Sequence, residues 1–447
     1  MCGCLVLRKV LLAVSSIKKK LYKGAKTCAY AVMRRCPPLR KALRKAVWET
    51  RSRRYDKLAG SIETNPKAVV FESFKGRSYS CSPRAVFEAM QADSRFSDYR
   101  FYWAFLDTTI EHYRYLEECY PNVTLVANMS AEYYRAYAES KYWIVNSRSA
   151  EQLRPKSDQV FVQCWHGTPL KKLGFDIVSG TTNAMNSFEE VATRYKIESS
   201  KWSYLVSPSR YTSDCLTSAF GLDDEWAEGN ILEIGYPRND AIVNTCDDES
   251  KVTALKERMA KELGFDKDKK LLLYAPTWRD NEFKANVGYV QDVMIDFDLL
   301  KEQLGDEWVV LFRPHYFVAN SFDFSKYDGF VANAASVADI NELYCIADAL
   351  MTDYSSVFFD YACTGRPMLF FMPDLAEYQG HVRGFYIDPI KDLPGPHCET
   401  SEEVVDALKE IGTYFERYGE AYEVFRQRFC PQEDGKAAKR LVERLFG

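Results

Sequence analysis

Polar side chains that can do chemistry follow several apolar stretches of this sequence, at the point where each stretch ends. The chain has five histidines, and two of them, His166 and His315, stand at such ends. Histidine is the side chain whose ordinary pKa suits proton transfer near neutrality. Arg313 precedes His315 across a single proline, so a permanent cation and a titratable donor follow the same apolar stretch. These residues predict a proton-transfer site beside a bound anion. The structural alternatives are a buried histidine bonded to a loop carbonyl and an arginine serving an ion pair.

A candidate phosphate site lies between two short apolar runs, Ala349–Met351 and Met368–Met372. Each run has the length of a buried strand, and the residues between them recur at helical spacing before a stop at Thr364-Gly365. The turn that opens this helix holds residue types that begin helices: Thr352, Asp353, Ser355 and Ser356. A strand, a turn, a helix and a strand make one unit of a doubly wound sheet, whose turn aims N–H groups and hydroxyls at a ligand. The turn therefore suits a phosphate, or it simply caps a helix.

Further candidates share a place beside these strand ends. Gly167 lets a ligand approach the backbone after His166, and Thr168 begins the next segment. Four weaker candidates remain, namely Thr277, Arg279, Asp353 and Asp360. The first two follow an apolar run, and the arginine is either a phosphate ligand or a surface residue. The first aspartate either caps the helix or belongs to the phosphate site, and the second either reaches a ribose hydroxyl or is solvated.

From Lys67 onward, apolar runs of strand length alternate with stretches at helical spacing. The predicted strands are 68–71, 100–105, 123–125, 142–145, 159–164, 205–206, 231–234, 271–275 and 308–312. Predicted helices include 82–92, 131–140, 252–263 and 337–346. This alternation predicts an α/β fold with parallel sheets. A polar stretch over 244–251 is the predicted boundary between two halves. Ligands bind outside the carboxyl ends of such strands, so two facing sheets would bring the polar groups to one cleft.

The first 54 residues carry 16 Lys and Arg against one acid, Glu49, although the whole chain of 447 residues has a formal net charge of −4. An acidic body on a basic arm is unlike a nucleic-acid enzyme with a basic cleft, so no nucleic-acid partner is expected. Apolar residues such as Trp48 are interspersed among the basic clusters, which suits helices lying on an anionic membrane surface. Arg8 and Lys9 interrupt the apolar opening and leave it too short to span a bilayer. A solvated tail and an RNA-binding arm are the alternatives.

The 13 cysteines are odd in number, scattered and without a CxxC pair. Neither a disulfide framework nor a zinc site is predicted, and the thiols should pack as small hydrophobes in a reducing compartment. The sequence also lacks a Gly-Lys-Ser/Thr phosphate loop and a Gly-x-Ser-x-Gly elbow. We expect neither a metal nor a cofactor.

Several short motifs then occur in a recognisable order. They are Trp165-His166-Gly167-Thr168-Pro169-Leu170-Lys171, Gly235-Tyr236-Pro237-Arg238-Asn239-Asp240, Tyr274-Ala275-Pro276-Thr277-Trp278-Arg279, Arg313-Pro314-His315, Thr352-Asp353-Tyr354-Ser355-Ser356, Arg383-Gly384-Phe385-Tyr386 and Pro394-Gly395-Pro396. The ordered set resembles the CDP-glycerol glycerophosphotransferase family, the teichoic-acid primases and polymerases. The resemblance runs from about Lys67 to the end of the chain. The basic arm matches no motif of the family, and primase and polymerase stay alternatives.

The resemblance implies two Rossmann-like domains facing a cleft, in a glycosyltransferase-B-like arrangement. The expected division is a basic, amphipathic, membrane-associating arm over 1–58, an acceptor-side domain over 59–247, and a CDP-donor-binding domain with closing carboxyl-terminal helices over 248–447. The resemblance also implies a peripheral enzyme on the cytoplasmic face of a bacterial plasma membrane, which agrees with the basic arm.

The resemblance further implies that an acceptor hydroxyl attacks the phosphorus next to the glycerol of CDP-glycerol, or of a related CDP-polyol, and that CMP leaves. His166 would be the general base, and His315 with Arg313 would hold the donor phosphates. The other donor-side residues would be Ser355, Ser356, Thr277, Arg279, Asp353 and Asp360, and the acceptor side would include Gly167 and Thr168. The acceptor would be a lipid-linked cell-wall or capsule polymer, with the anionic membrane surface as a second partner. The two histidines are expected to meet across the cleft, beside the serine turn.

Three rival functions remain at this point. A nucleotide-sugar glycosyltransferase could use the same fold, and a CDP-ribitol ribitolphosphotransferase could use the same motifs. A non-catalytic membrane-bound scaffold could have kept the fold alone, although the two histidines, the arginine and the serine turn argue against it.

Overall fold

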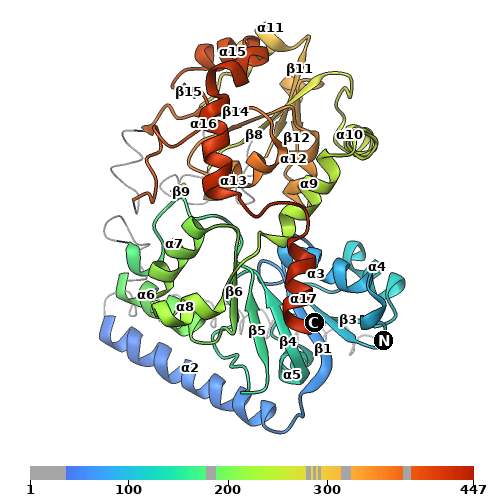
Figure 1. The fold of residues 1–447 in the computed structure, drawn as a ribbon, viewed down its shortest axis with the longest axis vertical. Helices are drawn as coiled ribbons and strands as arrows, with labels where there is room; N and C mark the ends of the chain where they lie inside the picture. Colours follow the sequence, from blue (N-terminus) through green and yellow to red (C-terminus); the bar gives the residue numbers. More distant parts are fainter. Residues whose placement is uncertain are drawn as a thin grey trace, which may run out of the picture.

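Two parallel β-sheets, one above the other along the long axis, form the body of the protein (Figure 1). The computed structural model describes residues 37–177, 188–277, 283–284, 288–289, 293–313, 324–375 and 384–447. The predicted α/β fold with two parallel sheets is confirmed. A small antiparallel pair, β9 (Phe283–Lys284) with β10 (Gly288–Tyr289), stands apart from both sheets.

The first sheet has the order β3-β2-β1-β4-β5-β6-β7, and its described pairings are all parallel. Its strands are β1 (Asn65–Glu72), β2 (Arg100–Phe105), β3 (Val123–Ala127), β4 (Ser140–Val145), β5 (Val160–Gln163), β6 (Tyr204–Ser207) and β7 (Ile231–Glu233). Its helices are α3 (Cys81–Gln91), α4 (Glu111–Cys119), α5 (Ala131–Glu139), α6 (Phe188–Ser199), α7 (Arg210–Phe220) and α8 (Asp224–Asn230). Val69 and Phe71 pack into one core and Ala68 and Val70 into the other. The strands are continuously apolar because both faces of a parallel sheet are buried.

The second sheet has the order β12-β11-β8-β13-β14-β15. Its strands are β8 (Lys270–Ala275), β11 (Trp308–Phe312), β12 (Val331–Asn333), β13 (Ala349–Thr352), β14 (Met368–Phe371) and β15 (His397–Cys398). The helices of this part are α9 (Asp240–Cys246), α10 (Glu249–Leu263), α11 (Phe297–Leu304), α12 (Ile340–Ile346), α13 (Val357–Tyr361), α15 (Ser401–Lys409) and α16 (Tyr414–Phe429). Leu271 and Leu272 again face two different cores. The strand, turn, helix and strand predicted over 349–372 are present.

The chain passes from the first sheet to the second earlier than the predicted boundary at 247/248. It crosses after β7 through a 3-10 turn, Pro237–Asn239. Ile242, on α9, is already buried in a core of the second sheet. The polar stretch predicted as the boundary is the junction of α9 and α10, where Asp248 caps α10 by accepting from the Ser250 and Lys251 N–H groups.

The last helix, α17 (Ala437–Phe446), returns to the first sheet rather than closing the second, and lies beside α3 (Figure 1). Leu441 and Val442 are buried in a core of the first sheet. The ring of Phe446 lies 4.3 Å from that of Tyr142 on β4. The carboxyl-terminal helices therefore tie the two halves together.

Helix α2 (Pro37–Ala59) runs along the far end of the first sheet's half (Figure 1). Tyr55 and Ala59 are buried in the same core as β1, whereas Leu43 and Val47 are exposed. The end of the predicted arm is thus part of the folded body, because its last turns cover apolar surface. Residues 1–36 lie outside the described part. None of the described helices is both long enough and apolar enough to cross a membrane.

Candidate active site

His166 lies at the carboxyl edge of the first sheet, three residues after β5 ends at Gln163. Its Nδ1 lies 2.6 Å from the backbone carbonyl oxygen of Asn146. A carbonyl oxygen can only accept, so Nδ1 carries the proton and Nε2 keeps a lone pair. Asn146 follows the neighbouring strand β4, and its side-chain oxygen accepts from the Phe74 N–H at 2.7 Å. The carbonyl that orients the imidazole is therefore held in place itself.

The surroundings of His166 disfavour its charged form. Desolvation by the surrounding protein, followed by the positive charges of Arg238, Arg148 and Lys75, lowers the pKa of the imidazole below its ordinary value. The hydrogen bond to Asn146 acts in the opposite direction. His166 is nevertheless exposed to solvent, which weakens the effect of desolvation on its pKa. The nearby positive charges still lower this pKa. At neutral pH the ring is neutral, with Nε2 ready to accept a proton.

Gly167 brings the histidine loop against the serine turn of the second sheet. A Cβ at Gly167 would lie 3.1 Å from Oγ of Ser356. Ser355 and Ser356 are half-buried, and neither hydroxyl bonds to any residue that the structure describes. The structure thus brings the predicted base and the predicted phosphate turn to one place. Thr168, predicted on the acceptor side, is buried.

Three of the donor-side candidates, Arg313, Thr277 and Asp353, follow β11, β8 and β13, which are neighbours in the second sheet. The Thr277 N–H donates to Oδ1 of the buried Asp353 at 2.8 Å, so this aspartate joins two strand ends. It does not cap α13, whose cap position is Ser356. The guanidinium of Arg313 donates to the carbonyl of Ala334, and desolvation lowers its pKa. Arg313 is half-buried and keeps further N–H groups for a ligand.

Asp360 is not solvated, and its carboxylate pairs with a protein group rather than being available for a ribose contact. Its carboxylate is buried and accepts from Arg238 Nη2 at 2.8 Å and Arg238 Nε at 3.2 Å. Its Oδ1 also accepts from Asn239 Nδ2 at 3.2 Å. Both oxygens are used within the protein, since a buried arginine needs a partner.

The Gly235–Asp240 motif, for which the sequence indicated no role, joins the two halves. Arg238 lies over the ring of Tyr236, at 4.0 Å, while it pairs with Asp360. Asp240 accepts from the Ala437 and Ala438 N–H groups, at 2.8 and 2.7 Å, and so caps α17. The motif is therefore structural, although it follows the predicted strand 231–234 in the same way as the site candidates follow theirs.

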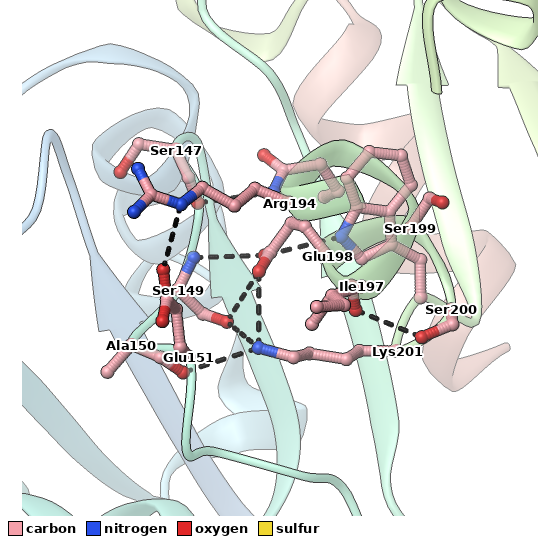
Figure 2. A network of polar contacts seen from close by, with 12 residues as sticks. Ser147, Ser149, Ala150, Glu151, Arg194, Ile197, Glu198, Ser199, Ser200 and Lys201 are labelled. Atoms are coloured by element: carbon pink, nitrogen blue, oxygen red, sulfur yellow. Dashed lines mark hydrogen bonds and ion pairs between the residues drawn. The ribbon is translucent and has the colours of Figure 1, made fainter. Parts of the chain in front are cut away.

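A buried ion pair holds the loop after β4 (Figure 2). Lys201 Nζ lies 3.2 Å from Glu198 Oε2, and their side chains are only 6% and 4% exposed. The Ser149 N–H and hydroxyl donate to this carboxylate at 2.9 and 3.0 Å. Lys201 also donates to the Ala150 carbonyl at 3.3 Å. The loop that carries Arg148 beside His166 is therefore fixed by the fold.

His315 and Arg279 lie outside the described residues, and so does Arg383. The expected meeting of His166 with His315 therefore stays a prediction. No group of three or more His, Cys, Asp or Glu side chains within the described ranges could hold a metal ion.

Comparison with known proteins gives a consistent result. Residues 57–447 match the family described as CDP-Glycerol:Poly(glycerophosphate) glycerophosphotransferase. The teichoic acid poly(glycerol phosphate) polymerase of Bacillus spizizenii is 37% identical over 403 residues, covering 88% of this chain and 95% of the relative. The teichoic acid glycerol-phosphate transferase of Staphylococcus aureus is 37% identical over 382 residues, covering 86% of this chain and 93% of the relative.

The teichoic acid poly(glycerol phosphate) polymerase of Staphylococcus epidermidis is 38% identical over 390 residues, or 86% of this chain, but the chain spans only 51% of that relative. It likewise spans half of the polymerase of Bacillus subtilis, 50% of its length. A solved structure of the wall teichoic acid polymerase TagF, soaked with CDPG, has a TM-score of 0.79 at 35% identity and covers 91% of this chain and 96% of that chain. The expected resemblance is confirmed: this chain belongs to the CDP-glycerol glycerophosphotransferase family.

Proposed function

We propose that this chain transfers glycerol phosphate from CDP-glycerol to a hydroxyl of a teichoic acid polymer and releases CMP. Its relatives are named glycerol-phosphate polymerases and transferases, and a related polymerase structure was soaked with CDPG. The observation that carries the proposal is the orientation of His166, whose Nε2 keeps its lone pair beside the loop that meets Ser356. A base and two unused hydroxyls on facing sheets suit phosphoryl-type transfer.

In the proposed reaction, His166 Nε2 accepts the proton of the acceptor hydroxyl while its oxygen attacks the phosphorus next to the glycerol. A new P–O bond forms, the bond from that phosphorus to the bridging oxygen breaks, and CMP leaves with the electron pair. The cations near His166 disfavour the imidazolium that results. Because the residue is exposed, its proton passes on to water and the base is restored.

On the donor side, the hydroxyls of Ser355 and Ser356 would donate hydrogen bonds to the diphosphate, and the guanidinium of Arg313 would offset part of its charge. Thr277 lies at the strand end between them, and we propose Arg279 and His315 as further donor contacts. Gly167 would leave room for the substrates on the acceptor side. Asp353 and Asp360 bind protein groups instead, so we propose no donor contact for them.

We further propose a glycosyltransferase-B-like cleft and a peripheral location at the cytoplasmic face of the membrane, reached through the basic segment 1–58. That segment would bring the site to a lipid-linked acceptor. The support is its composition and the exposed Leu43 and Val47 among the basic residues of α2. Vesicles with and without anionic lipid, mixed with the full chain, test this by sedimentation.

A panel of donors tests the reaction. The purified chain is given CDP-glycerol, CDP-ribitol or a UDP-sugar with a teichoic acid acceptor, and CMP or UDP is measured. We expect CMP from CDP-glycerol, because the poly(ribitol-phosphate) polymerase of Bacillus spizizenii matches only 51% of this chain. Release of UDP alone would support a glycosyltransferase, and release of no nucleotide would support a scaffold.

A further inference from the structure

Two cations, Lys75 and Arg148, stand beside His166 without an ion-pair partner in the part of the chain that the structure describes. Lys75 follows β1 and Arg148 follows β4, and these strands and β5 are neighbours in the first sheet. Neither side chain has an ion pair or a side-chain hydrogen bond with any residue in the described ranges. Arg148 only packs over the ring of Tyr195, at 5.4 Å. Both charges act on the imidazole of His166.

The acidic groups that could neutralise these cations already have partners. Glu72 is buried and accepts from the hydroxyls of Tyr133 and Tyr137, both at 2.9 Å. Glu198 is paired with the buried Lys201 (Figure 2). Desolvation and then the charges of Arg148 and Arg77 lower the pKa of Lys75, despite the opposing pull of the two carboxylates. Positive charge is therefore in excess at this edge of the sheet.

The backbone that carries the two cations is held in place by the fold. Phe74 and Lys75 adopt left-handed backbone angles, with φ of 48° and 59°, which residues with side chains rarely adopt. The loop after β4 holds this conformation, because Asn146 Oδ1 accepts from the Phe74 N–H and Ser147 Oγ from the Lys75 N–H, at 2.7 and 3.2 Å. Such strained residues persist only where the surroundings determine them, and they cluster at ligand sites.

We propose that Lys75 and Arg148 bind a phosphate of the acceptor and so hold its terminal hydroxyl against Nε2 of His166. The ligand is a phosphodiester or phosphomonoester anion, and this inference rests on the proposed function. Both cations come from the first sheet, on the side of the base, whereas the groups proposed for the donor come from the second. The acceptor phosphate and the donor diphosphate therefore occupy different halves of the site.

Two short synthetic acceptors, identical except that one carries a phosphodiester next to its terminal glycerol, test the proposal in the full chain. CMP release gives the KM of each acceptor and of CDP-glycerol. We expect the unsubstituted protein to prefer the charged acceptor, with a preference that weakens as salt rises. This comparison needs no variant.

The variants are Lys75→Asn, since asparagine tolerates the left-handed conformation, and Arg148→Gln, with Arg148→Lys as the charge-retaining form. Each neutral variant should raise the KM of the charged acceptor roughly 10- to 100-fold, the loss of one charged hydrogen bond. The KM of the neutral acceptor and of CDP-glycerol should stay within about threefold, and Arg148→Lys should recover part of the loss. Arg135→Gln, an exposed arginine on α5, is the matched control.

Equal KM values for the two acceptors would overturn the inference. If CMP were still released in that experiment, the proposed function would remain supported. A rise in the KM of CDP-glycerol instead would assign the two cations to the donor diphosphate. No CMP release from either acceptor in the unsubstituted protein would overturn the proposed function and the inference with it.

Discussion

Replacing Asp360 with asparagine should destabilise the protein and leave donor binding unchanged. The substitution removes the charge that faces Arg238, whose side chain is only 5% exposed. Breaking a buried pair by neutralising one partner costs about 3–5 kcal/mol, because the other charge stays buried and unpaired. Arg238 cannot lose its proton to escape this cost.

The loss converts to a shift in melting temperature. A unit of about 200 residues shifts by roughly 2–4 °C per kcal/mol, so the pair predicts a fall of roughly 6–20 °C. Calorimetry or thermal unfolding followed by circular dichroism measures this shift. The double variant Asp360→Leu with Arg238→Met removes both charges and should recover most of the loss.

The alternative in which Asp360 contacts the donor ribose predicts the opposite pattern. A melting temperature within about 2 °C of the unsubstituted protein, which corresponds to at most about 1 kcal/mol, would refute our account. A raised KM for CDP-glycerol in that same variant would return Asp360 to the donor site.

Three further predictions follow from single residues. Gly174→Ala should destabilise by about 2–5 kcal/mol in urea unfolding, because φ is 50° and the new Cβ would lie 1.9 Å from the Ala219 carbonyl oxygen; a loss under about 1 kcal/mol would contradict the packing described. Burial raises the pKa of Glu433 from 4.5 to about 8. The contribution of this group to stability is therefore fully present below about pH 4.5 and is lost as the pH rises through about 8. Glu433→Gln should therefore flatten the dependence of melting temperature on pH in that window, and an unchanged curve would exclude this group. Since its surroundings lower the pKa of His166, kcat/KM should fall on the acid side with a midpoint below about 6.5, and a midpoint above that value would contradict the described surroundings.

Local patterns in the sequence were sufficient to predict many of the strands and helices. The predicted strands at 100–105 and 271–275 correspond to β2 and β8 within a residue, because continuous apolar runs bounded by turns have one compact solution in a parallel sheet. Ligands meet the carboxyl ends of strands, and this rule, together with the expectation of two facing sheets, predicts that His166 and the Ser356 turn come together, as they do. The same rule applied to β4 would have found Asn146.

Partners far apart in the chain could not be predicted from one sequence. Arg238 and Asp360 are 122 residues apart, and nothing in either neighbourhood indicates the other. The return of α17 to the first sheet could not be predicted either, because the apolar residues of this helix could pack against either half of the protein. The Glu198–Lys201 pair was missed since charged residues spaced three apart usually lie on a solvated helix face.

His166→Ala tests whether His166 removes the proton from the acceptor hydroxyl. CMP release should be measured under single-turnover conditions with CDP-glycerol and a teichoic acid acceptor, and donor binding by calorimetry on the same sample. We expect the rate to fall ~10²–10⁴-fold and the donor Kd to stay within about threefold of that of the unsubstituted protein. Turnover close to that of the unsubstituted protein would contradict this role of His166.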